Sequence, residues 1–386
     1  MYASYLRTIA LLLLLFACGY GVCTLILFRS GEYLSLEDIV ETQRSSSGIC
    51  LYGSVLHNDY AFYKLEGQRA AKPSIVSIGT SRVLGFREQF FTKPFYNMGM
   101  SVTSIRNGQE LTDRMIASGR PDILLLGIEP WWFNRGFRTT GRGETVMDGS
   151  RFHFRDAIRL ARLFVLRRIP IPKLHHRALA SPTSCMIGVQ ATEQQAGFGV
   201  DGSYYYTNLV TGTTRNVDER FARTQQWVQS GTDFFVYGSS IHLAHWKEFV
   251  SWLRGMQQQG ITVIGFIPPF AATVNREMER QPDRYAYIAS LLRLAEKEGI
   301  PLVDLRDAEA FGSSDCEFLD GYHGGSVTTA RLLLALKDRY PALESVVDTA
   351  AVMSFIRENT GYAMEKNSPL LAGKKEGDFL KIGCRK

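Results

Sequence analysis

Short apolar runs alternate with amphipathic segments along most of this chain. The runs are rich in isoleucine, leucine and valine, which is typical of strands buried on both faces of a parallel sheet. The segments between them have apolar residues at helical spacing. The predicted strands are residues 75–78, 123–128, 261–267 and 301–304, and the predicted helices are residues 83–91, 105–117, 242–259, 285–298 and 326–336. This alternation predicts an α/β fold with a doubly wound parallel sheet.

The longest apolar run covers residues 9–28, twenty positions without a charge between Arg7 and Arg29. That length spans the hydrocarbon core of a bilayer. The short basic N-terminus and the acidic residues beyond Arg29 favour a single membrane span with the N-terminus inside and the rest of the chain outside. A cleaved signal peptide is the alternative, with Ala17 and Cys18 at a small-residue site. Because apolar residues continue for ten positions beyond Cys18, we expect an uncleaved anchor.

The pattern divides the chain into four segments. Residues 1–29 are a cytoplasmic tail and anchor, 30–71 a stem, 72–340 the α/β domain, and 341–386 a C-terminal helix and tail. Within the stem, residues 60–65 are either an early strand or a surface segment. The α/β domain contains an insertion at about 135–235, where the alternation breaks down.

Part of the insertion is strongly basic. Residues 151–177 contain eight Lys or Arg residues and one acid, Asp156. Arg155, Arg159 and Arg162 recur at helical spacing with apolar residues between them, which predicts an amphipathic basic helix. Its basic face meets either solvent, anionic lipid or an acidic glycan.

Composition narrows the function classes. A hydrophobic content of 45% excludes a globally disordered chain. The net charge of +6 fits anionic lipids or acidic glycans, and because no nucleic-acid motif accompanies it, we expect no nucleic-acid partner.

Four of the six cysteines lie outside the anchor: Cys50, Cys185, Cys316 and Cys384. None has metal-ligand spacing, so we predict neither a metal nor a cofactor. In an exported domain these cysteines form two disulfides in one of three connectivities, and a bridge at Cys316 fixes the loop at Asp320. Free buried thiols are the alternative.

Two short motifs carry candidate chemistry. The run 75–78 leads through Gly79 into a turn with Ser81 at its tip, just before a predicted helix. Such a serine is either a helix N-cap or a nucleophile at the carboxyl edge of the sheet. Far along the chain, Asp320 and His323 are three residues apart in one loop. A serine nucleophile needs a base and an orienting carboxylate, and these residues supply both.

Together the motifs resemble the sequence blocks of the SGNH (GDSL-like) hydrolase superfamily, which has a flavodoxin-like fold, over roughly residues 72–340. The first block is a Gly-x-Ser turn after strand one, here ending at Ser81, and the last is Asp-x-x-His before the final helix. The second block is similar to the segment ending at Gly99, whose N–H would line the oxyanion hole with that of Ser81. Glu129 replaces the usual asparagine of the third block, which leaves Asn134 as the candidate third member.

Within that superfamily, the chain is most similar to membrane-anchored proteins that acetylate bacterial polysaccharides or assist D-alanylation of cell-wall polymers. The resemblance implies a serine O-acyltransferase or esterase that acts on O-acyl groups, expected to be O-acetyl, of a cell-surface polysaccharide. It also implies a membrane-bound O-acyltransferase partner, and a place in the bacterial inner membrane with the catalytic domain on the periplasmic side. The alternative is a docking protein of such a complex, with a vestigial triad.

Aromatic and basic residues near these motifs are candidates for substrate binding. Adjacent tyrosines beside a turn can stack on sugar rings, although tyrosines in a strand more often serve packing. The candidate substrate-binding residues are Arg82, Trp131, Tyr204, Tyr205 and Tyr322.

Overall fold

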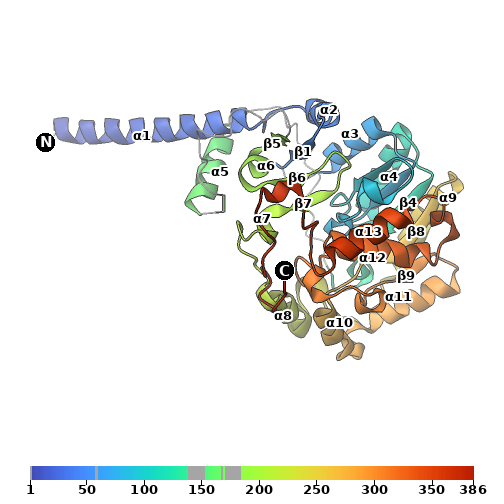
Figure 1. Ribbon diagram of the computed structural model, residues 1–386. Coiled ribbons are helices and arrows are strands. Elements are labelled where there is room, and N and C mark those ends of the chain that lie inside the picture. Colours follow the sequence, from blue (N-terminus) through green and yellow to red (C-terminus); the bar gives the residue numbers. More distant parts are fainter. Residues whose placement is uncertain (1, 57–59, 138–152, 167, 170–183) are drawn as a thin grey trace. The chain divides into compact units, whose positions relative to one another are not determined.

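The computed structural model describes residues 2–56, 60–137, 153–166, 168–169 and 184–386 (Figure 1). The chain forms two compact units. The smaller comprises Met1–Asp59 and Glu144–Val200, and the larger comprises Tyr60–Gly143 and Asp201–Lys386. The unit boundaries therefore run through both the predicted stem and the predicted insertion, because strands from these two segments pair with each other in the smaller unit.

The larger unit is built around a five-stranded parallel sheet with the strand order β3-β2-β4-β8-β9. Its strands are β2 (Ile75–Ile78), β3 (Phe95–Met98), β4 (Ile123–Gly127), β8 (Thr262–Ile267) and β9 (Leu302–Asp304). Ile78, the last residue of β2, pairs with Met98 on one side and with Leu126 on the other. The loops that follow these strands therefore meet at the carboxyl edge of the sheet.

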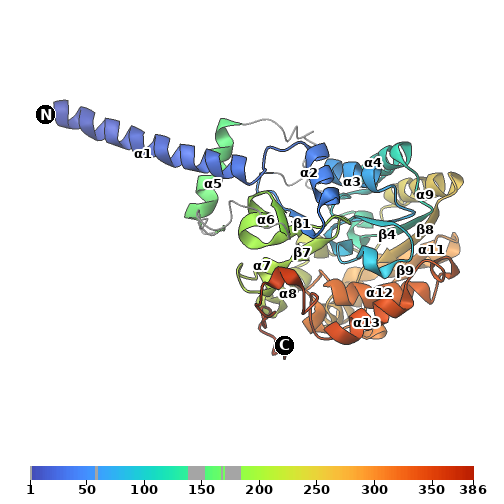
Figure 2. The same ribbon diagram turned by 45° about the horizontal axis from the view of Figure 1, so that its top comes forward.

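Helices cover both faces of this sheet. On one face, Val76 and Leu124 share a buried core with α4, α9 and α11, while on the other, Ile75 and Leu125 pack with α12 and α13. In Figure 2, α12 and α13 lie below the strands and α4 and α9 lie above them. The helices of the larger unit are α3 (Ala61–Ala71), α4 (Ile105–Ser118), α7 (Thr207–Val210), α8 (Ala222–Ser230), α9 (Leu243–Gln258), α10 (Ala272–Glu279), α11 (Ala286–Lys297), α12 (Ser326–Lys337) and α13 (Thr349–Asn359). The predicted mixed α/β architecture with a parallel sheet is confirmed.

Two local predictions were wrong. Residues 83–91 form no α-helix: two 3₁₀ turns, η1 (Ser81–Val83) and η2 (Glu88–Phe90), occupy this segment, and its apolar side chains pack directly into the core. Of the two alternatives for residues 60–65, the strand is wrong: residues 61–65 belong to the helix α3, and Tyr60 is its N-cap. Lys64 and Gln68 of α3 are buried, so the helix face turned to the core carries polar residues and shows no apolar periodicity.

The smaller unit contains three strands of a second sheet. Its strand β1 (Ile49–Tyr52) is parallel to β5 (Ser184–Ile187) and antiparallel to β6 (Ala196–Phe198). Cys50 and Cys185 are direct partners in the β1–β5 register and form a disulfide. The buried carboxylate of Glu32 accepts hydrogen bonds from the Ser54 hydroxyl and the Val189 N–H, at 2.6 and 2.8 Å. The smaller unit also contains the helices α2 (Leu36–Ser45) and α6 (Val189–Gln194).

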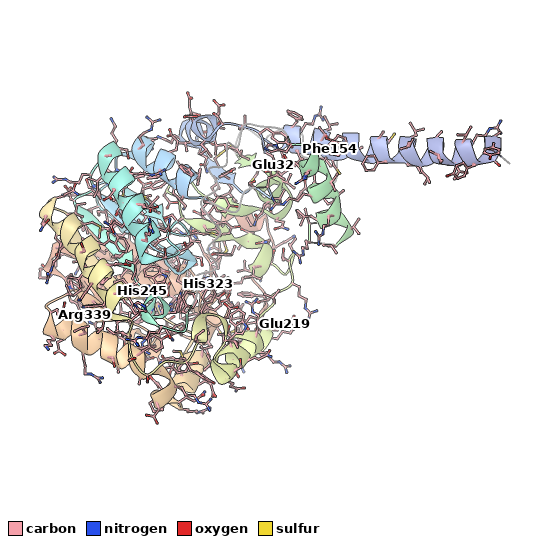
Figure 3. The ribbon with its side chains drawn as sticks, turned by 180° about the vertical axis from the view of Figure 1, so that it is seen from behind. Glu32, Phe154, Glu219, His245, His323 and Arg339 are labelled. Carbon is pink, nitrogen blue, oxygen red and sulfur yellow. A yellow bond between two sulfur atoms is a disulfide. The ribbon has the colours of Figure 1, made fainter. Side chains whose placement is uncertain are left out.

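Helix α1 (Tyr2–Arg29) is long and apolar enough to cross a membrane. The predicted basic helix is present as α5 (Phe154–Val165), which packs its buried Ala157 and Leu160 against Cys23 and Leu27 of α1. Figure 3 shows Phe154 beside α1, where its ring stacks on that of Tyr20 at 4.7 Å.

Alanine substitutions at two glycines test the side-chain packing of the larger unit. Gly67 lies where α3 meets β3, and a Cβ atom there would lie 1.9 Å from the Tyr96 hydroxyl, which belongs to a buried side chain. We expect Gly67→Ala to lower the free energy of unfolding by about 1–3 kcal/mol through overpacking. Gly255 of α9 has open space around it, so Gly255→Ala should add about 0.5–1 kcal/mol through helix propensity. Thermal melts of the full chain that shift in the same direction for both variants would contradict this packing.

Candidate active site

Ser81 follows directly from the way β2 ends. The strand stops at Ile78, and Thr80 takes the N-cap position of η1, where its hydroxyl accepts a hydrogen bond from the Arg82 N–H at 3.3 Å. Because Thr80 is the cap, the Ser81 side chain has no capping role. Its Oγ atom lies 2.7 Å from Nε2 of His323.

The loop that carries His323 is held in place at several points. A disulfide between Cys316 and Cys384 ties its start to the C-terminal tail. The Leu319 N–H donates to the carbonyl oxygen of His323 at 2.9 Å, which closes the loop into a tight turn. Figure 3 shows His323 inside the larger unit. The ring therefore has a fixed place opposite Ser81.

Asp320 orients the imidazole of His323. Its carboxylate oxygens lie 2.8 and 3.0 Å from Nδ1 of His323, and it also accepts hydrogen bonds from the N–H groups of Tyr322 and His323, at 3.0 and 2.8 Å. Burial raises the pKa of Asp320, but the attraction of His323 and these hydrogen bonds outweigh burial and hold that pKa below its ordinary value. The carboxylate thus stays charged, keeps the proton on Nδ1 and leaves Nε2 to accept the hydroxyl proton of Ser81.

A buried ion pair joins the strand ends beneath the site. Arg82 donates from Nη1 to Glu129 at 2.6 Å, and both side chains are almost fully buried. Its other nitrogens donate to the backbone oxygens of Tyr322, Pro268 and Pro269, at 2.9, 2.6 and 2.8 Å. One guanidinium therefore connects the ends of β2, β4 and β8 to the loop of His323.

Glu129 also binds the residue before the serine. The Thr80 hydroxyl donates to its second carboxylate oxygen at 2.5 Å. Glu129, at the place where the sequence resemblance predicts an asparagine, thus fixes the turn that carries Ser81. Arg82, predicted to bind substrate, is used by the fold in the same way.

The residues predicted to form an oxyanion hole are only partly brought together. The backbone N–H of Ser81 has no hydrogen-bond partner in the part of the chain that the structure describes, so it is free to bind an oxyanion. The N–H of Gly99 instead donates to the Asn97 side chain at 2.7 Å. The Asn134 amide donates to the carbonyl oxygen of Val236 at 2.6 Å and accepts from the Gly136 N–H at 2.8 Å. Gly99 therefore serves a local turn, and Asn134 joins its own turn to the distant segment of Val236.

A pocket of about 460 Å³ opens beside Ser81. Its walls come from the loops after β2, β3 and β4, and from residues near Phe234 and Tyr322. Of the candidate substrate-binding residues, Trp131 and Tyr322 line this pocket, as does the edge of Arg82.

Tyr204 and Tyr205 lie elsewhere in the larger unit. Tyr204 is buried, and the ring of Tyr205 lies against the Arg87 guanidinium at 3.9 Å. Neither residue lines the pocket beside Ser81. The adjacent tyrosines serve packing here, which is the alternative that their strand position offered.

Several residues of the site gave little signal in the sequence. Met100 and Phe234 line the pocket from segments without a motif. Glu129 could have been noticed as a lone acid directly after an apolar strand, since a charge there needs a buried partner. Among the described residues, no group of three or more His, Cys, Asp and Glu side chains is placed to hold a metal ion.

Removal of Arg82 tests the buried ion pair. We expect Arg82→Met to lower the free energy of unfolding by about 3–5 kcal/mol, because Glu129 is left charged and unpaired in the interior. The control is Arg276→Met, whose partner Glu309 is half exposed and whose loss should cost at most about 1 kcal/mol. Denaturant titrations that give both variants the same small loss would show that the Arg82–Glu129 pair does not hold the strand ends together.

No protein-family model matches this chain, and no curated protein matches it. The chemistry of the site therefore rests on its own geometry: a serine hydroxyl, an imidazole and a carboxylate in hydrogen-bonded sequence beside a pocket.

Proposed function

We propose that this protein is a serine-dependent acyl-transfer enzyme, with Ser81 as nucleophile, His323 as general base and acid, and Asp320 as the residue that orients His323. The observation that carries the proposal is the continuous chain of hydrogen bonds from the Ser81 hydroxyl through His323 to Asp320. Residues separated by more than 200 positions meet in the order that nucleophilic catalysis requires.

The first half of the reaction forms an acyl-enzyme. Oγ of Ser81 attacks the carbonyl carbon of an ester while Nε2 of His323 takes the hydroxyl proton. The Ser81 N–H donates to the oxygen that becomes negative. The bond to the leaving alcohol then breaks, and the alcohol oxygen receives the proton from His323. Asp320 stabilises the imidazolium between these two proton transfers.

The second half releases the acyl group. A water molecule or a sugar hydroxyl attacks the acyl carbon and gives its proton to His323, which returns that proton to Oγ of Ser81 as the acyl bond to Ser81 breaks. Water as acceptor makes the protein an esterase, and a sugar hydroxyl makes it an acyltransferase. The two directions differ only in acceptor binding and in the exclusion of water.

The proposal includes a place for this chemistry at the cell envelope. An N-terminal helix long enough to span a bilayer and two disulfides support a single-pass membrane protein whose larger unit lies on the oxidising, periplasmic side of a bacterial inner membrane. The resemblance to SGNH proteins that modify polysaccharides then indicates O-acyl groups of a cell-surface glycan as substrate, with a membrane-bound O-acyltransferase as the partner that delivers the acyl group.

Substitution of the triad tests the chemistry. With the full chain in detergent, we expect hydrolysis of p-nitrophenyl esters to fall at least about a thousandfold in Ser81→Ala, because the hydroxyl group that His323 activates is removed. Asp320→Asn should lower kcat by a similar factor, since His323 then loses its orientation and tautomer. Ser354→Ala on α13, away from the pocket, is the matched serine control and should leave the rate unchanged.

Two results would reject the proposal. Full hydrolysis by Ser81→Ala would show that the serine is not the nucleophile. A folded native protein that hydrolyses none of the esters and transfers no acyl group to glycan acceptors would favour the docking protein of an acyltransferase complex.

Reporter fusions test the orientation. We expect alkaline phosphatase fused after Lys386 to be active in bacterial cells, because that enzyme needs the disulfide-forming periplasm. A cytoplasmic fluorescent reporter at the same position should be dark. The reverse pattern would place the larger unit in the cytoplasm and remove the envelope substrate from the proposal.

A further inference from the structure

We infer that the pocket beside Ser81 binds the acyl part of the substrate, and that this acyl group is an apolar chain of about four to eight carbons rather than an acetyl group. This inference rests on the proposed serine chemistry and extends it from the type of reaction to the class of substrate. Three observations support it: the pocket walls are mainly apolar, most of the polar groups in the pocket already form hydrogen bonds within the protein, and the pocket is much larger than an acetyl group.

The walls of the pocket are mainly apolar. Met100 and Val102 come from the loop after β3, Trp131 and Trp132 from the loop after β4, and Phe234 faces them. The rings of Trp131 and Phe234 are 5.0 Å apart, and the ring of Phe234 lies 5.6 Å from that of Tyr322. Side chains from separate segments thus form one continuous apolar surface that leads to the serine.

The polar groups of the pocket are mostly occupied. Arg82 makes four hydrogen bonds to Glu129 and to backbone oxygens, and the Thr80 hydroxyl donates to Glu129. The Ser81 hydroxyl is paired with His323. Thr103, Tyr322 and the indole N–H groups of Trp131 and Trp132 are the other polar side-chain groups among the residues that line it. Nε1 of Trp132 is buried and has no hydrogen-bond partner among the described residues. A sugar ring would leave most of its hydroxyl groups unpaired here, whereas an alkyl chain has no such groups to satisfy.

The size of the pocket also favours a chain. Its volume of about 460 Å³ is far more than the methyl group of an acetyl ester occupies, and lies in the range of pockets that enclose ligands of many atoms. An acetyl group would leave the distant walls without contact, so their apolar surface would contribute nothing to binding.

Among the residues of the pocket wall, Met100 gives the strongest support for an apolar ligand. It is 40% exposed and has a positive φ of 66°, a backbone conformation that non-glycine residues seldom adopt. The Met100 N–H donates to the carbonyl oxygen of Thr80 at 3.0 Å, and the Val102 N–H donates to that of Gly79 at 3.2 Å. The loop therefore holds an adaptable, exposed thioether directly beside the turn that carries Ser81, and such side chains suit flexible apolar ligands.

The chain-length profile of ester hydrolysis tests the inference. The substrates are p-nitrophenyl acetate, butyrate, hexanoate and octanoate, with the full chain in detergent and each rate divided by that of uncatalysed hydrolysis. Since one buried CH₂ group is worth up to about a fourfold gain, we expect kcat/KM for hexanoate to exceed that for acetate by at least about tenfold. Met100→Ala should lower kcat/KM for hexanoate about five- to tenfold and that for acetate less than twofold.

The control is Met353→Ala, an exposed methionine on α13 that does not line the pocket and should change neither rate. Comparison of variant and native protein on the same ester cancels the partition of longer esters into micelles. A native protein that prefers acetate, or a Met100→Ala variant that loses activity equally on acetate and hexanoate, would overturn the inference while it leaves the serine chemistry intact.

A binding measurement separates this inference from the catalytic proposal. In Ser81→Ala, p-nitrophenyl hexanoate should quench tryptophan fluorescence with at least about tenfold tighter binding than the acetate ester, because Trp131 and Trp132 line the pocket. Equal binding of the two esters would reject the apolar-chain pocket. Tight binding of hexanoate by a protein whose native form hydrolyses no ester and transfers no acyl group to glycan acceptors would keep the pocket and reject the catalytic proposal.

Discussion

The site depends on one buried ion pair. Arg82 and Glu129 are taken out of water at the carboxyl edge of the sheet, where an unpaired charge would cost several kcal/mol. Their hydrogen bonds reach the ends of three strands, the turn before Ser81 and the loop of His323. The geometry of serine and histidine, which come from opposite ends of the domain, is thus fixed by a group that has no chemical role of its own.

The same pair explains the character of the pocket. A guanidinium at the edge of a substrate pocket normally attracts anions or hydroxyl groups, but here its donors are directed at the protein. What lines the pocket beside Ser81 is mainly a surface of aromatic and aliphatic side chains, with the backbone N–H of Ser81 available at the serine. The arrangement therefore favours an acyl chain on this side of the serine and leaves the acceptor to approach from outside it.

The sequence by itself determined the elements with strong patterns. Continuous apolar runs predicted the strands β2, β4 and β8, and apolar residues at helical spacing predicted the helices α4, α9 and α11. The observed bounds of these elements lie within about one residue of the predicted bounds. Ser81, His323 and Asp320 could be chosen as partners because a serine nucleophile needs a base and an orienting carboxylate, and Asp-x-x-His in one loop supplies both. The length and apolar composition of residues 9–28 predicted a helix able to cross a membrane, and α1 is long and apolar enough to do so.

Only the tertiary structure decided the rest, because it depends on contacts between distant residues. Gly99 and Asn134 fit an oxyanion hole by sequence position, but which partner an amide takes is set by its neighbours in space. Helix α3 could not be predicted from the sequence because its buried face carries Lys64 and Gln68. The hydrogen-bond partners of these two residues lie on other segments of the chain. The role of Glu129 likewise depends on its contacts with Arg82 and Thr80, which lie 47 and 49 positions away in the chain. The pattern of apolar residues along the sequence indicates which positions are buried. Which polar groups form hydrogen bonds with one another is decided only by the folded structure.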